Sequence, residues 1–82
     1  MTYRAELSER VLGQLSDFPA KAFDALIVAM AKVVEYPDDP MQTFPTSDPY
    51  VRRANFGAAG LVTYVINDAR QTVTLTDVTW AG

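Results

Sequence analysis

The side chains best suited to chemistry are three arginines in the C-terminal part of the chain, Arg52, Arg53 and Arg70. A guanidinium group stabilises negative charge on a phosphate, so all three are candidate phosphate contacts. Arg52 and Arg53 are neighbours in a predicted strand, and therefore at most one of them lies on an open sheet face. A surface ion pair is an equally good interpretation of either residue, and a solvated charge is the default for Arg70 in its predicted turn.

Cysteine and histidine are both absent. Their absence excludes thiolate and imidazole metal sites, redox thiols, and catalytic triads that use either residue. Asp38, Asp39 and Asp48 flank prolines, and we interpret them as solvated turn carboxylates, because such a loop does not guarantee the convergent geometry of a metal site. No metal and no cofactor is expected. Any catalysis must use Arg, Lys, Tyr, Ser, Thr or carboxylate groups.

Charge is unevenly distributed over the 82 residues, whose formal net charge is -3. Residues 1–49 hold four basic and eight acidic side chains, whereas residues 50–82 hold three basic and two acidic ones. Only the C-terminal part is therefore suited to face a polyanion. An acidic protein is a poor generic nucleic-acid binder, because long-range repulsion opposes its encounter with phosphates.

A small set of helices and strands must position these residues. Residues 3–7 alternate as a short strand does, and Ser8 is placed to cap a short helix after it. Pro19 separates this helix from a second one, in which apolar side chains recur at helical spacing over residues 23–34. The second helix is apolar on its other side too, so we expect it to contact both the first helix and a sheet.

The second half of the chain is predicted to be a loop followed by strands. The proline-rich stretch 37–49 has no apolar period and is predicted to be a long loop. Strands are predicted over residues 50–56, 61–67 and 72–80, and a slip in the alternation at Thr76-Asp77 predicts a β-bulge in the last one. The order β-α-α-β-β-β predicts an α+β two-layer sandwich, with a helical hairpin packed on one face of a mostly antiparallel sheet. The other face of the sheet is left open.

The length allows one hydrophobic core, so residues 1–82 are expected to form a single domain. The charged N-terminus lacks the apolar run of a secretory signal, and no stretch is long enough to span a bilayer. We expect a cytoplasmic protein without membrane contact, and a homodimer is one way to stabilise so small a core. Trp80, near the end of the chain, either folds back onto the sheet, which is slightly favoured, or serves as a partner-binding anchor.

A family resemblance rests on three segments: Tyr50-Val51-Arg52-Arg53, the hairpin over residues 60–68, and the closing strand over residues 73–80. With the order of elements, these segments resemble the RelE/ParE superfamily of bacterial type II toxins, over almost the whole chain. The resemblance implies a cognate antitoxin protein as partner. In the ribosome-dependent members it also implies an endoribonuclease (mRNA interferase) that cuts messenger RNA in the ribosomal A site, using Arg and Lys on the open sheet face and a C-terminal Tyr or His. By this resemblance Arg52 and Arg53 are candidate catalytic residues and Arg70 is a candidate RNA contact.

The sequence departs from this pattern at several positions. Arg52 falls where these enzymes often have a basic residue, but Leu61, three positions before Tyr64, stands where they often have Arg. The basic residues expected near the end of the last strand are replaced by Trp80, Ala81 and Gly82. Each missing electrostatic donor costs about 10²-fold or more in rate. We therefore expect weak or absent cleavage that depends on Arg52, and we interpret Tyr64 as a core residue.

Two functions remain open at this point. The first is a type II toxin that inhibits translation at ribosome-bound mRNA with weakened or absent nuclease residues. The alternative is a non-catalytic binding or oligomerisation domain of the same fold, or a gyrase-directed ParE-like inhibitor, which needs no nuclease residues.

Overall fold

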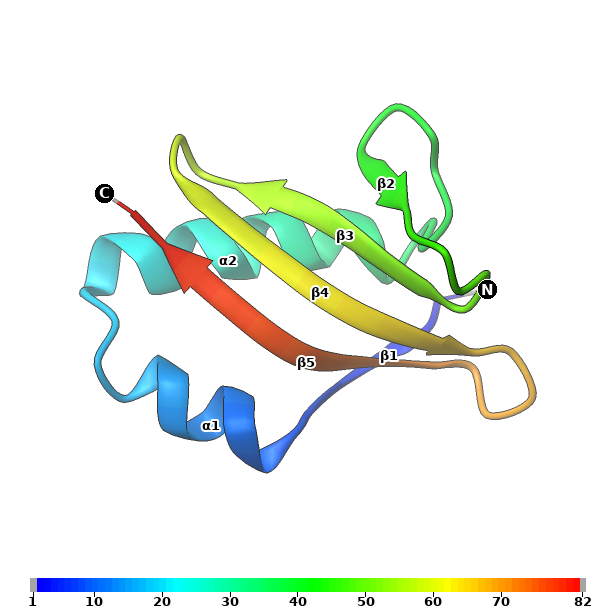
Figure 1. Cartoon of the computed structure of the whole chain (residues 1–82), viewed down its shortest axis with the longest axis horizontal. Helices are drawn as coiled ribbons and strands as arrows, with labels where there is room; N and C mark the ends of the chain where they lie inside the picture. Colours follow the sequence, from blue (N-terminus) through cyan, green and yellow to red (C-terminus); the bar gives the residue numbers. More distant parts are fainter. Residues whose placement is uncertain (1, 82) are drawn as a thin grey trace.

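The structure, a computed structural model, describes residues 2–81 as two helices and five strands (Figure 1). The elements are β1 Arg4–Leu7, α1 Glu9–Leu15, α2 Ala20–Val33, β2 Thr43–Pro45, β3 Val51–Phe56, β4 Gly60–Asn67 and β5 Thr72–Trp80. The strands lie in the order β1-β5-β4-β3-β2, with β1 parallel to β5 and all other neighbours antiparallel. α1 packs on β5 and β1, and α2 packs on β3. The predicted two-layer α+β fold is confirmed.

The prediction that residues 37–49 form only a long loop is wrong, because this stretch contains the edge strand β2. Thr43 and Pro45 lie opposite Ala54 and Arg52 of β3. Proline has no N–H to donate and is tolerated at such an edge, which is why this short strand leaves no strong signal in the sequence. The loop before β2 is anchored by Tyr64, whose hydroxyl donates to the Pro37 carbonyl at 2.6 Å.

The second helix is covered on one side only. It buries Ala22, Leu26, Met30 and Val33. Its other apolar side chains remain largely exposed: Phe23, Ile27 and Val28 at 42%, 53% and 61%. The expectation that both sides of this helix would be covered is therefore wrong. An apolar surface of this helix is left without a partner.

The core lies between the helices and one face of the sheet. Alternate side chains of the three central strands point into it: Ala54, Phe56, Val62, Tyr64, Ile66, Val73, Leu75 and Val78. Gly60 has to be glycine, since a Cβ there would lie 2.5 Å from the Phe56 ring. This alternation decides which strand residues are left for the opposite face.

The predicted β-bulge in β5 is confirmed. Thr63 lies opposite Asp77 and Tyr64 lies opposite Leu75, so Thr76 is an additional residue without a counterpart on β4. The additional residue restores the alternation, and both Leu75 and Val78 are buried in the core.

Candidate functional site

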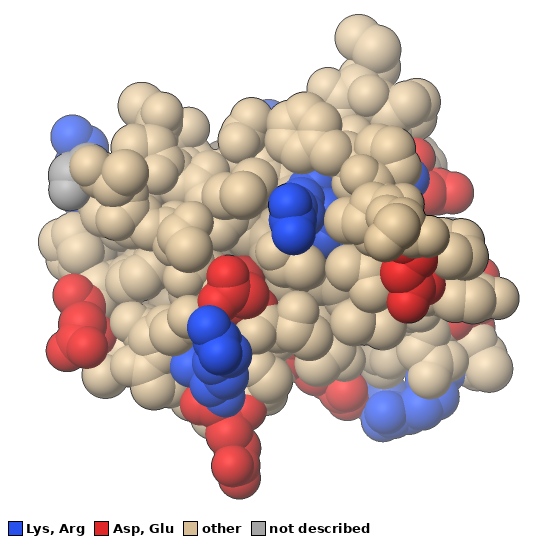
Figure 2. Space-filling model, in the orientation of Figure 1, with Lys and Arg blue, Asp and Glu red and all other residues tan. Residues whose placement is uncertain are grey.

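The candidate functional surface is the sheet face turned away from the helices, which we call the open face. In Figure 1, α2 passes behind the strands, so the same view in Figure 2 shows the open face. Most of this surface is uncharged, and its basic and acidic side chains stand in small separate groups (Figure 2). The alternation of β3 and β4 assigns to it Val51, Arg53, Asn55, Leu61, Thr63 and Val65.

Arg52 does not lie on the open face, and the expectation that it would is wrong. It lies opposite Tyr64 of β4, and it shares the helix side of β3 with Ala54, two residues further on. Its Nε donates to the Thr43 hydroxyl at 2.9 Å, and its terminal nitrogen lies 3.5 Å from the Thr43 carbonyl oxygen. This half-buried guanidinium therefore fastens β2 to β3. The apolar residues Ala54 and Phe56 were the sequence signal for the correct phase of this strand.

Arg53 is the arginine that lies on the open face. It is exposed, and its cross-strand neighbour is Thr63, which in turn lies opposite Asp77. Arg53, Thr63 and Asp77 thus form a row across three strands. Within residues 2–81 the Arg53 guanidinium makes no hydrogen bond or ion pair, so it is available to a ligand.

Asp77 places negative charge on this row. Its Oδ1 accepts from Gln14 Nε2 at 2.8 Å and from Arg10 Nε at 3.1 Å. The hydrogen bond from Gln14, followed by that from Arg10, lowers the pKa of Asp77 below its ordinary value, and the charge of Arg53 adds to this. The carboxylate is therefore ionised at neutral pH, and its repulsion of a phosphate opposes the attraction by Arg53. Nothing in the sequence signalled the contact between Gln14 and Asp77, which are far apart in the chain.

The remaining predicted site residues are not brought to Arg53. Leu61 lies on the open face, diagonally across from Arg53, and supplies an apolar side chain there. Arg70 lies in the turn between β4 and β5 and pairs with Glu6 of β1 at 3.3 Å. Both partners of this pair are exposed, so Arg70 forms a surface ion pair where a solvated charge was expected. A role of Arg70 in RNA binding stays a prediction. Arg53 is therefore the one basic side chain that the described parts of β3, β4 and β5 place on the open face.

Trp80 is folded back onto the helix side of the sheet, the alternative that the sequence slightly favoured. Its ring stacks on Phe56 with centroids 5.7 Å apart. The side chain is not fully buried, and it borders a hollow with Pro19 and Ala59. A partner-binding role for this residue stays a prediction.

Tyr64 is fully buried, which confirms that it is a core residue. Burial raises the pKa of its hydroxyl, so it does not act as a base near neutral pH. Among residues 2–81 no three His, Cys, Asp or Glu side chains are grouped so as to hold a metal ion. Neither helix in that range is long and apolar enough to cross a membrane.

Comparisons with known proteins find similarity in structure alone. No protein-family model matches the sequence, and no curated protein matches it. The E. coli toxin RelE, as an arginine-to-alanine double mutant in complex with a peptide of the antitoxin RelB, superimposes with a TM-score of 0.85 at 18% identity, covering 100% of this chain and 86% of that one. The toxin–antitoxin complex RelBE2 of Mycobacterium tuberculosis gives 0.83 at 18% identity, covering 99% and 100%. The intact E. coli RelBE complex gives 0.83 at 17% identity, covering 98% of both chains. The chain therefore has the fold of the RelE toxins.

Proposed function

We propose that this protein is the toxin component of a bacterial, cytoplasmic type II toxin–antitoxin system, which inhibits translation at ribosome-bound mRNA with little or no nuclease activity. The observation that carries the proposal is the full-length structural correspondence. The RelBE2 and intact RelBE matches cover at least 98% of this chain and of the matched chain, and both structures are toxin–antitoxin complexes. A cognate antitoxin protein is accordingly the proposed partner.

The composition of the open face supports the weak-nuclease part of the proposal. Attack of a ribose 2′-hydroxyl on its phosphodiester builds negative charge on the phosphate and requires proton transfer. Arg53 can stabilise that charge, but Leu61 beside it contributes no donor and Asp77 opposes it. The hydroxyl of Thr63 is uncharged at neutral pH and is a poor proton acceptor. Asp77 is the carboxylate nearest to Arg53, but hydrogen bonds from Gln14 and Arg10 stabilise its ionised form and lower its pKa, which makes it a weak base. Arg53 therefore acts as a phosphate contact without an effective general base.

A second candidate is a non-catalytic binding domain of the same fold. The exposed apolar side of α2 favours it, because a surface of this kind commonly binds a partner. The two candidates predict different effects on a cell, because only a toxin should stop growth when it is expressed.

The experiment is inducible expression of the intact chain in E. coli, with growth and soluble protein followed together. We expect growth to stop on induction and to resume when the protein encoded beside this chain is co-expressed. A control variant is Arg4→Glu, which alters an exposed residue of β1, at the opposite side of the sheet from β3, and should leave the growth arrest intact. Normal growth at high levels of soluble wild-type protein would reject the toxin proposal in favour of the binding domain.

A further inference from the structure

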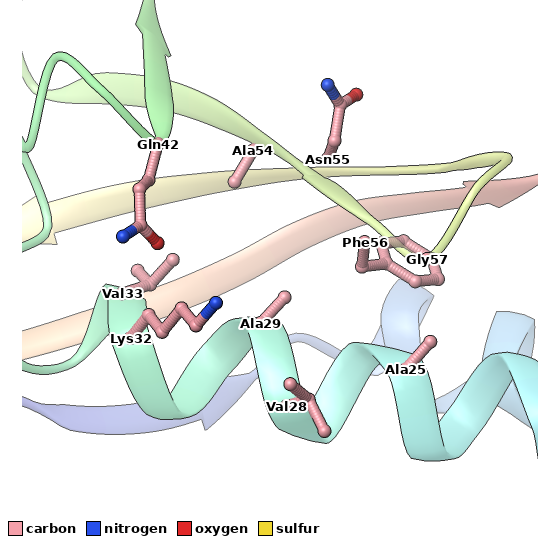
Figure 3. Close-up of a pocket in the computed structure, with 10 residues that line it drawn as sticks. All are labelled: Ala25, Val28, Ala29, Lys32, Val33, Gln42, Ala54, Asn55, Phe56 and Gly57. Atoms are coloured by element: carbon pink, nitrogen blue, oxygen red, sulfur yellow. The ribbon is translucent and has the colours of Figure 1, made fainter.

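The side of α2 turned away from the sheet combines exposed apolar and charged residues. Figure 3 shows Ala25 and Ala29 pointing from the helix toward the strands, whereas Val28 points away from them. Val28 is 61% exposed and Ile27 is 53% exposed. A shallow depression of about 580 Å³ extends this surface to Tyr36, beyond the end of the helix. We call the surface the outer face of α2, and its residues are Lys21, Asp24, Ile27, Val28, Ala31, Lys32 and Glu35, all of them exposed.

The outer face forms one straight ridge. Its residues follow Lys21 at intervals of three and four along the chain, which is the spacing of a seam by which one helix packs along another. The helical path continues beyond Val33, because the Tyr36 N–H donates to the Lys32 carbonyl at 3.1 Å. Glu35 therefore keeps its place on the ridge. The fourteen-residue rise from Lys21 to Glu35 gives the ridge a length of about 21 Å.

The four charges of the outer face are arranged about Val28. Lys21 and Asp24 precede Val28 by seven and four residues. Lys32 and Glu35 follow it by four and seven residues. Every charge thus has a charge of opposite sign at the same distance on the other side of Val28. Within residues 2–81 none of the four side chains forms an ion pair, so all are available to a partner.

This arrangement of charges is complementary to itself. If a second copy of the helix runs in the opposite direction, with Val28 on the two-fold axis, then Lys21 of one copy faces Glu35 of the other. In the same way Asp24 of one copy faces Lys32 of the other, and the symmetry repeats both contacts. A parallel pair of helices in register would instead place each charge against its own kind, which is unfavourable. The charges therefore favour the antiparallel pair.

The apolar residues of the outer face lie at its middle, where the two copies would meet. Ile27, Val28 and Ala31 of each copy would pack against their equivalents in the other. This contact would remove from water the apolar side chains that a single chain leaves exposed. Ala31 adds little bulk, so the two helix axes can approach to about 8–10 Å.

We propose that two copies of this chain associate through the outer face of α2, as an antiparallel pair of helices with Val28 on the two-fold axis. An unrelated partner would require no symmetry in the charges, whereas a second copy requires each charge to be matched by its opposite at equal distance from the centre. The inference goes beyond the proposed function and does not depend on it. A contact along one helix is smaller than a standard interface, so we expect a weak dimer with a Kd of about 0.1 mM.

Sedimentation equilibrium of the full chain tests for this dimer. We expect a monomer at about 10 µM and mostly dimer at about 1 mM, given the expected Kd. Val28→Asp places two carboxylates together on the axis and should weaken dimerisation about tenfold or more. Leu12→Asp makes the same change at a position of α1 that is 55% exposed, and it should have no effect. A wild-type chain that stays monomeric at the higher concentration, or a dimer that Val28→Asp does not weaken, would overturn the proposal.

Reversal of single charges tests which residues face each other. Lys21→Glu alone and Glu35→Lys alone should each weaken dimerisation about tenfold or more, because like charges then meet. An equimolar mixture of these two variants should dimerise as well as wild type, since every facing pair again has opposite signs. The matched control is Asp24→Lys, which changes the net charge as Glu35→Lys does. Its mixture with Lys21→Glu leaves like charges facing at positions 21 and 35 and at positions 24 and 32, so it should stay weak.

The two mixtures decide the proposal. Restoration by Glu35→Lys and not by Asp24→Lys is the expected result. Equal restoration by both would show an attraction of net charges without this register and would overturn the proposal, as would restoration by neither. All of these variants alter exposed side chains, and far-ultraviolet circular dichroism checks that each is folded. No ribosome or antitoxin enters the measurement, so its outcome is independent of whether the chain stops growth.

Discussion

Among single residues, the contrast between two adjacent arginines is the most informative. Arg52 is half-buried against Thr43, and Arg53 is exposed on the open face. Arg52 therefore stabilises the pairing of β2 with β3, and Arg53 is free to contact a ligand. Their adjacency on a strand makes each the control for the other.

We predict that Arg52→Ala lowers the free energy of unfolding by about 1 kcal/mol, because the bond to Thr43 that fastens β2 is lost. Arg53→Ala should stay within about 0.5 kcal/mol of wild type, since it removes an exposed side chain without a partner. Urea unfolding of the two variants measures both values. Equal losses, or a larger loss for Arg53→Ala, would contradict this assignment of the two faces.

A pH dependence follows from Asp77. Its pKa is lowered in the folded protein, chiefly by the Gln14 hydrogen bond, from an ordinary value of 3.8. A lowered pKa stabilises the fold above the ordinary value, and this stabilisation is lost as the pH falls from about 4 through the lower folded value. Asp77→Asn should therefore be less stable than wild type at pH 7, by a difference that shrinks below about pH 4. Urea unfolding across this range tests it, and a difference that does not vary with pH would refute it.

At the level of elements, α1 completes the sheet where β1 is too short to do so. β1 pairs with β5 only over residues 72–75. Beyond this range Gln14 of α1 takes the place of a strand: its Oε1 accepts from the Val78 N–H at 2.9 Å, and its Nε2 donates to Asp77. The side chain of a helix residue thus covers the free edge of β5 and protects it from pairing with other chains.

We predict that Gln14→Leu destabilises the protein by about 1 to 3 kcal/mol, because the Val78 N–H loses its acceptor. Leu12→Ala, on the exposed side of the same helix, is the matched control and should cost much less. Thermal unfolding compares them, and hydrogen exchange at the Val78 amide should quicken only in Gln14→Leu. A slow, unchanged Val78 amide in that variant would show that Gln14 does not protect the edge.

Over the whole molecule, regular periodicity decided what the sequence could predict. The 3.6-residue period of α2 and the alternation of β4 and β5 located these elements, and the slip at Thr76 located the bulge. β2 was not predicted, because three residues held by tertiary contacts carry no period of their own. An open sheet face was predicted correctly, but the arginine on it was not. Arg52 was assigned to that face by comparison with a family, whereas the buried Ala54 and Phe56 show that Arg52 shares the helix side with them and that Arg53 faces outward.

The most direct test adds the purified chain to a reconstituted translation reaction and measures the length of the message recovered from the ribosomes, with the protein yield followed in the same tube. E. coli RelE serves as the positive control for cleavage, and Arg53→Ala and Arg52→Ala serve as variants. We predict that protein synthesis falls while the message stays intact at times when RelE has cut its own, and that Arg53→Ala weakens the inhibition more than Arg52→Ala does. Robust cleavage of the message by the wild-type chain, or undiminished synthesis at concentrations that stop growth, would contradict this account.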